Sequence, residues 1–128
     1  FNAGLEQVFG DRAPEIHEAI RDFVFSMPLA LRCECKGPDG RRGMDILCSH
    51  SLPGLAMMAR FDPGVLSREL TRADYEPRGG AAHIMVWGRG YDAEQLEDLV
   101  ERWGVNLFIL GHEKAPSGAA LVPPNALV

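Results

Sequence analysis

The feature that most constrains the fold is a capped amphipathic helix that leads directly into an apolar strand. Asp92 is a good helix N-cap, and Gln95, three residues later, completes a capping box. Gly104 supplies a stop after apolar residues that recur at helical spacing, namely Leu96, Leu99, Val100 and Trp103. The apolar run 105–110 begins at once, which predicts a short buried strand with His112 where it surfaces.

The apolar segment before this helix, residues 82–87, predicts a further strand that breaks at Gly88-Arg89-Gly90. Strand, helix and strand in this order are typical of a βαβ unit. Such a unit carries the carboxyl ends of both strands to one edge of a sheet, where α/β proteins bind their ligands. We therefore expect Arg89 and His112 to lie near each other.

The first half of the chain predicts a helix and a hairpin. Pro14 suits a first helical turn, and apolar residues continue at helical spacing up to the break at residues 26–28. Residues 29–35 and 44–50 are apolar runs on either side of a Pro-Asp-Gly turn, which indicates paired strands, and the second run ends in His50. The expected class is α/β, of an α+β-like type with a mixed sheet.

Length and composition limit the possible classes of protein. A chain of 128 residues that opens on Phe1 predicts a single domain, residues 1–128, or the C-terminal fragment of a larger one. The net charge of −5, with scattered basic residues, argues against a nucleic-acid partner. No apolar run reaches membrane-spanning length, so we expect no membrane association. Three cysteines without a framework spacing predict a reduced, cytoplasmic protein.

Three expected elements end in side chains suited to metal and phosphate chemistry. His50 and His112 follow strands, and imidazoles are borderline ligands suited to zinc, manganese or iron. Arg89 follows the third element, and its planar guanidinium matches a pair of phosphate oxygens. Metal ions and an arginine together serve phosphoryl transfer to water, in which negative charge builds on the equatorial oxygens.

In this order the motifs resemble the calcineurin-like metallophosphoesterases, and within them the Ser/Thr protein phosphatase type. Met27-Pro28-Leu29-Ala30 is similar to the family's entry into a strand, and residues 46–50 to a strand that ends in a metal-binding histidine. Arg89-Gly90-Tyr91 resembles the segment whose arginine holds the substrate phosphate. Leu110-Gly111-His112 resembles the last metal-ligand histidine, and Pro124-Asn125 a step near the family's end. The resemblance covers nearly all of the chain.

The resemblance implies the C-terminal part of a β-sandwich flanked by helices, with a site for two divalent metals (Mn, Fe or Zn). His50 and His112 would bind the same metal, and Arg89 would bind the phosphate of a phosphomonoester, with Ser/Thr phosphoproteins as one candidate substrate class. The family usually has glycines after the first histidine, where Ser51 and Leu52 stand here. Its upstream ligand segments are absent, so we expect hydrolase activity from a full-length protein and none from this chain alone.

Two other interpretations stay open. Cys33, Cys35, Cys48 and His50 lie in pairs on the two strands of the expected hairpin, and four N/S ligands would suit a structural zinc ion. Buried cysteines more commonly serve as small hydrophobic residues. Alternatively, the chain is a non-catalytic binding module that lacks the upstream ligands by nature.

Overall fold

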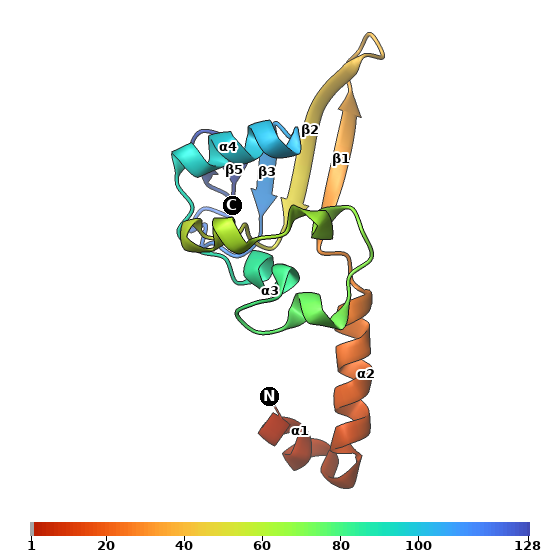
Figure 1. Ribbon diagram of the computed structural model, residues 1–128. Helices are drawn as coiled ribbons and strands as arrows, with labels where there is room; N and C mark the ends of the chain where they lie inside the picture. Colours follow the sequence, from red (N-terminus) through yellow and green to blue (C-terminus); the bar gives the residue numbers. More distant parts are fainter. Residues whose placement is uncertain (1) are drawn as a thin grey trace.

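The structure, a computed structural model, describes residues 2–128 and combines a mixed five-stranded sheet with helices (Figure 1). The chain is therefore of the α/β class, as predicted. The α-helices are α1 (Asn2–Phe9), α2 (Ala13–Ser26), α3 (Ala81–Val86) and α4 (Ala93–Trp103). The strands are β1 (Ala30–Lys36), β2 (Arg42–Ser49), β3 (Leu107–Leu110), β4 (Leu121–Val122) and β5 (Ala126–Leu127). Short 3-10 helices are η1 (Gly10–Arg12), η2 (Leu55–Arg60), η3 (Pro63–Leu66) and η4 (Arg72–Tyr75).

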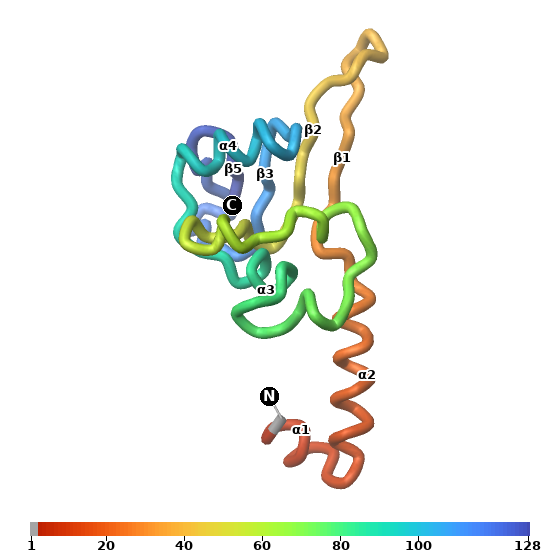
Figure 2. Tube along the Cα trace, viewed as in Figure 1, coloured from red at the N-terminus to blue at the C-terminus, as the bar shows by residue number. Residues whose placement is uncertain are grey.

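The strands follow the order β1-β2-β3-β5-β4 across the sheet. β1 and β2 form the predicted antiparallel hairpin, and β4 and β5 are also antiparallel. β2 and β3 are parallel neighbours, as are β3 and β5. The chain leaves β2 at one end of the sheet and returns through η2, η3, η4, α3 and α4 before it enters β3 (Figure 2). The carboxyl ends of β2 and β3 therefore lie at the same edge.

Adjacent rows of side chains on the sheet differ in exposure. One row, Leu47, Phe108 and Ala126, is buried on the face that α4 covers. The next row lies on the opposite face and crosses all five strands in register. We call it the open row, and it consists of Leu31, Cys48, Ile109, Leu127 and Leu121. Leu31, Ile109 and Leu121 are 60%, 37% and 64% exposed. The sheet thus has one covered face and one apolar face that stays largely open.

Helix α4 and its caps agree with the prediction in all but one contact. The Asp92 side chain accepts a hydrogen bond from the Gln95 amide at 2.9 Å, as an N-cap does. Gly104 adopts a left-handed conformation with φ of 61° and closes the helix. The Gln95 side chain does not complete the predicted capping box, because its Nε2 donates to the Pro53 carbonyl at 2.6 Å instead. Tertiary packing has redirected this amide away from the helix end.

The prediction of a strand at residues 82–87 is wrong, because this segment forms the helix α3. Ala81, Ala82, Ile84 and Met85 are all buried. A short apolar run that is buried on most sides has no usable periodicity, so its pattern does not separate helix from strand. Arg89 therefore follows a helix and not a strand. The parallel neighbour of β3 is β2, so His50 lies at the strand end where Arg89 was predicted.

Helices α1 and α2 form an arm that projects from the rest of the molecule (Figure 1). The helix predicted at residues 14–26 is α2, and it meets the body near its end, where Phe25 stacks on Tyr75 with ring centroids 4.4 Å apart. Phe23 and Val24 are exposed, so much of the predicted apolar stripe of α2 is not buried. Within residues 2–128, no helix combines the length and the apolar character that a membrane crossing requires.

Candidate functional site

His50 and His112 lie side by side because they follow adjacent parallel strands. β2 ends at Ser49 and β3 at Leu110, and these two residues are register partners. The amide of Gly111 donates to the carbonyls of Ser49 and His50, at 3.2 Å each, which ties the two strand ends together. His112 Nδ1 lies 2.8 Å from His50 Nε2, and the two rings meet edge to face.

Arg89 joins the two histidines from the loop after α3. Its Nη2 lies 3.0 Å from His112 Nδ1. Its Nη1 donates to the carbonyl of Val86, at 3.3 Å, and to the carbonyl of Gly88. The guanidinium carbon also lies 6.0 Å from the centre of the Trp87 ring. The three residues predicted for the site thus form one cluster, which we call the histidine–arginine cluster.

Two backbone segments in direct contact bring Arg89 to the histidines. The buried loop at residues 51–54 follows His50 and runs against residues 88–89. A Cβ at Gly88 would overlap the Leu52 carbonyl, and a Cβ at Gly54 would overlap the Arg89 carbonyl. Glycine at both positions therefore allows an approach that any side chain would prevent.

Two buried polar side chains anchor the loop at residues 51–54. Ser51 is 2% exposed, and its Oγ donates to the Gly88 carbonyl at 2.6 Å. Gln95 of α4 is 4% exposed and donates to the Pro53 carbonyl. Neither contact can be predicted from the sequence, because each joins residues that are far apart in the chain. Serine and glutamine are also common in loops and helix caps, so their presence here is not distinctive.

The pKa of His112 is held below its ordinary value. Neighbouring groups remove water from the imidazole, and protonation would also place a positive charge beside Arg89 and His50, while Glu113 acts in the opposite direction. Because arginine can only donate, the Nδ1 that faces Arg89 is the unprotonated, accepting nitrogen of His112. His112 is therefore neutral at pH 7, which is the state that a metal-binding imidazole needs.

The histidine pair fits one part of a metal site. Tetrahedral zinc with zinc–imidazole bonds of about 2.0–2.1 Å spaces two ligand nitrogens about 3.3 Å apart, so the two nitrogens, now 2.8 Å apart, would have to separate slightly to hold one ion. His112 Nδ1 has a single lone pair, so it either accepts hydrogen bonds from Arg89 and His50 or binds an ion. Among residues 2–128, no three His, Cys, Asp or Glu side chains are grouped to hold an ion. A catalytic ion needs about three protein ligands, and the described chain supplies two of them.

The residues of the structural-zinc interpretation do not converge. Cys33 and Cys48 are diagonal neighbours across β1 and β2, whereas Cys35 is exposed farther along the hairpin. His50 contacts His112 instead of the cysteines. Burial raises the pKa of the Cys48 thiol, and the adjacent Cys33 thiol raises it further, so the metal-binding thiolate is disfavoured.

A groove of about 570 Å³ opens beside His50. Its walls are mainly apolar and come from the end of α2, from β1 and from the ends of β2 and β3. Met27, Leu31 and Ile109 are among its lining residues, so the groove runs from the histidine–arginine cluster onto the open face of the sheet.

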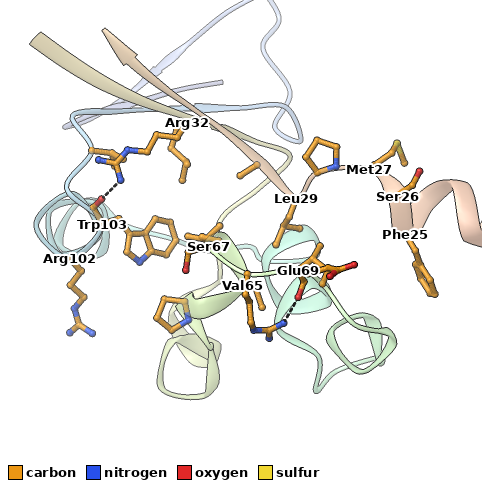
Figure 3. Close-up of a pocket in the computed structure, with 18 residues that line it drawn as sticks. Phe25, Ser26, Met27, Leu29, Arg32, Val65, Ser67, Glu69, Arg102 and Trp103 are labelled. Carbon is orange, nitrogen blue, oxygen red and sulfur yellow. Dashed lines mark hydrogen bonds between the residues drawn. The ribbon is translucent and has the colours of Figure 1, made fainter. Parts of the chain in front are cut away.

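A second cavity, of about 690 Å³, lies between the end of α2, β1, the segment 63–70 and the end of α4 (Figure 3). Three arginines line it, but each is already paired: Arg32 with Asp45, Arg68 with Asp74, and Arg102 with Asp98. Arg32 also donates to the Trp103 carbonyl beside the cavity (Figure 3). Because its cations are engaged, this cavity is a weaker candidate for an anionic ligand than the histidine–arginine cluster.

Comparisons with known proteins identify no relative of the chain. No family model, no curated protein and no solved structure matches it. The functional assignment therefore depends on the residues and the geometry of the site.

Proposed function

We propose that the chain forms part of a metal-dependent phosphoester hydrolase of the calcineurin-like type. His50 and His112 bind one divalent ion (Mn, Fe or Zn), and Arg89 binds the phosphate of a phosphomonoester, with Ser/Thr phosphoproteins as a candidate class. The observation that carries the proposal is that His50 and Arg89, from two separate segments, reach within 3.0 Å of one nitrogen, His112 Nδ1. The remaining ligands of a two-metal site come from outside these 128 residues.

Arg89 has a distinct task in this proposal. The metal ions, when bound, activate a water molecule for attack on phosphorus. A guanidinium offers paired N–H donors to the equatorial oxygens, where negative charge builds. Because the carbonyls of Val86 and Gly88 hold Nη1, Nη2 can exchange His112 for an oxyanion while the guanidinium stays in place.

We also propose that the sheet is one layer of a β-sandwich and that the protein acts in the cytoplasm. Sheets with parallel strands are normally covered on both faces, and the open row from Leu31 to Leu121 is apolar and exposed. A second layer on this face would bury the row and could bring further ligands toward His50 and His112. The free thiols of Cys33, Cys35 and Cys48 suit a reducing compartment.

Zinc binding tests the histidine assignment. In calorimetric titration of the 128-residue chain with Zn²⁺, we expect His50→Ala and His112→Ala each to weaken binding about tenfold or more. His17→Ala on α2 should leave the affinity unchanged, because His17 lies on the arm. Equal zinc affinity in wild type and both site variants would refute the proposed ligands.

Phosphate binding to the zinc-loaded chain tests Arg89. Arg89→Ala should weaken inorganic phosphate binding about tenfold, because hydrogen bonds to charged groups are strong. Zinc should bind at least as tightly as in wild type, because Arg89 no longer occupies His112 Nδ1. Arg89→Lys should restore part of the loss, since it keeps the charge but not the planar fork. Arg41→Ala, in the exposed hairpin turn, is the matched control. Unchanged kcat/KM for phosphomonoesters in Arg89→Ala of the full-length enzyme would also contradict the role.

A non-catalytic binding module is the second candidate function, and the open row favours it. Three large side chains of the open row are exposed, and such a surface suits packing against a partner. If the chain is a non-catalytic binding module, we expect no phosphate binding that depends on Arg89. The phosphate titration therefore separates the two candidates.

A further inference from the structure

We infer that Ser51 is a positioning residue for Arg89 and acts through the carbonyl of Gly88. Ser51 follows His50 directly, and its side chain is buried. Its Oγ lies 2.6 Å from the Gly88 carbonyl oxygen and 3.4 Å from the Leu52 carbonyl oxygen, so Gly88 is the stronger acceptor. The inference rests on the proposed function only in giving Arg89 the task of binding phosphate.

The Gly88 carbonyl connects the Ser51 hydroxyl to the guanidinium of Arg89. A carbonyl oxygen has two lone pairs and can accept two hydrogen bonds. This carbonyl accepts one from Ser51 Oγ and one from Arg89 Nη1. Arg89 Nη1 also donates to the Val86 carbonyl, so it is held between two carbonyls. Nη2 is then left to face His112 Nδ1.

Backbone contact alone does not orient the Gly88 carbonyl. Gly54 and Gly88 allow the two segments to touch, but glycine also permits many orientations of the adjoining peptide groups. The Ser51 hydroxyl restricts this freedom, because its short hydrogen bond from a buried position holds the Gly88 carbonyl in one direction.

The mobility of the Arg89 guanidinium tests the inference directly, without metal or substrate. In ¹⁵N relaxation measurements on the 128-residue chain, Ser51→Ala should lower the Arg89 Nε order parameter toward the flexible range, below about 0.6. The Arg32 Nε signal should not change, because Asp45 and the Trp103 carbonyl hold that side chain elsewhere.

Two further variants serve as controls for the hydroxyl group. Ser51→Thr keeps the hydroxyl and should keep Arg89 ordered. Ser67→Ala removes another serine that donates to a glycine carbonyl, Gly64 at 3.3 Å, on an exposed segment, and should leave Arg89 unchanged. If Ser51→Ala does not fold, Ser51→Cys replaces it, because cysteine is close in size and a much weaker donor. A fully ordered Arg89 in the folded Ala or Cys variant overturns the inference.

Phosphate titration separates this inference from the proposed function. Ser51→Ala should weaken phosphate binding severalfold without weakening zinc binding, and it should add nothing to Arg89→Ala in the double variant. A loosened Arg89 in a chain whose wild type binds no phosphate would support Ser51 as the positioning residue and refute the proposed function. Phosphate binding that depends on Arg89 but not on Ser51, with Arg89 as ordered in Ser51→Ala as in wild type, would support the proposed function and refute Ser51 as the positioning residue.

Discussion

Gly88 lies against the carbonyl of Leu52, and Gly54 lies against the carbonyl of Arg89. The site depends on the absence of a side chain at these two residues, because an added methyl group at either glycine would overlap a backbone oxygen. Backbone oxygens cannot rotate away as a flexible side chain can, so the two segments would have to separate. Arg89 would then move away from His112.

Gly88→Ala is therefore expected to damage both stability and the site. Overpacking of this kind costs about 1–3 kcal/mol or more, and the variant should also lose phosphate binding that depends on Arg89. Gly79→Ala is the matched control, because a Cβ at Gly79 meets nothing within 4 Å. Urea denaturation and phosphate titration of the two variants check this, and equal stability of both would contradict the close contact.

A partly buried ion pair joins two parts of the segment between β2 and α3. Arg68 donates to both carboxylate oxygens of Asp74, at 2.8 and 2.6 Å, and the amide and hydroxyl of Thr71 donate to the same carboxylate. The Asp74 carbonyl in turn packs against Gly80, directly before α3. The network therefore lies against the start of α3, and Arg89 is in the loop that follows this helix.

The Arg68–Asp74 pair should make stability depend on pH. Hydrogen bonding to Arg68 holds the pKa of Asp74 well below its usual range, although burial opposes this, and Thr71 contributes in the same direction as Arg68. The folded pKa lies below the unfolded value of about 3.9, so the carboxylate stabilises the fold fully above that pH. This stabilisation is lost as the pH falls from there through the folded pKa.

Asp74→Asn should accordingly lower stability at pH 7 and flatten the fall in stability between about pH 4 and pH 2. Urea denaturation at a series of pH values measures both effects. Asp98→Asn breaks an exposed pair with Arg102 and should change little, as surface pairs contribute little. A fall in stability of the same steepness in wild type and Asp74→Asn would exclude the network as its source.

Taken as a whole, the molecule is a sheet with one packed face, an apolar open face and a helical arm (Figure 1). Phe108 and Leu121 lie on opposite faces of the sheet and show the contrast, at 0% and 64% exposed. Contact between apolar side chains and water is unfavourable, and burial against another layer would remove this contact. The arrangement fits a chain that packs against further structure.

Substitutions on the two faces should have different consequences in the isolated chain. Leu31→Thr and Leu121→Thr should change the free energy of unfolding by less than about 0.5 kcal/mol, because both side chains are largely in water. Both should also reduce binding of the dye ANS, which reports exposed apolar surface. Phe108→Ala should cost about 3–5 kcal/mol, because its ring is fully buried. Large losses from the two threonine variants would mean that the open row is covered.

Local spacing was sufficient to predict several elements of the fold. The periodicity and proline of α2, the turn between β1 and β2, and the cap and glycine stop of α4 all act within a few residues. The strand-ending positions of His50 and His112 follow from the same local patterns. Periodicity, capping and turn chemistry are short-range effects, so the amino-acid order alone reveals them.

Contacts between distant segments could not be predicted in the same way. The apolar run at residues 82–87 became a helix because the core surrounds it, and β2 became the neighbour of β3 in its place. Ser51 and Gly88 are 37 residues apart, and Gln95 and Pro53 are 42 apart. Such pairs depend on how packed elements meet in space, because a buried polar group takes whichever partner the fold brings to it.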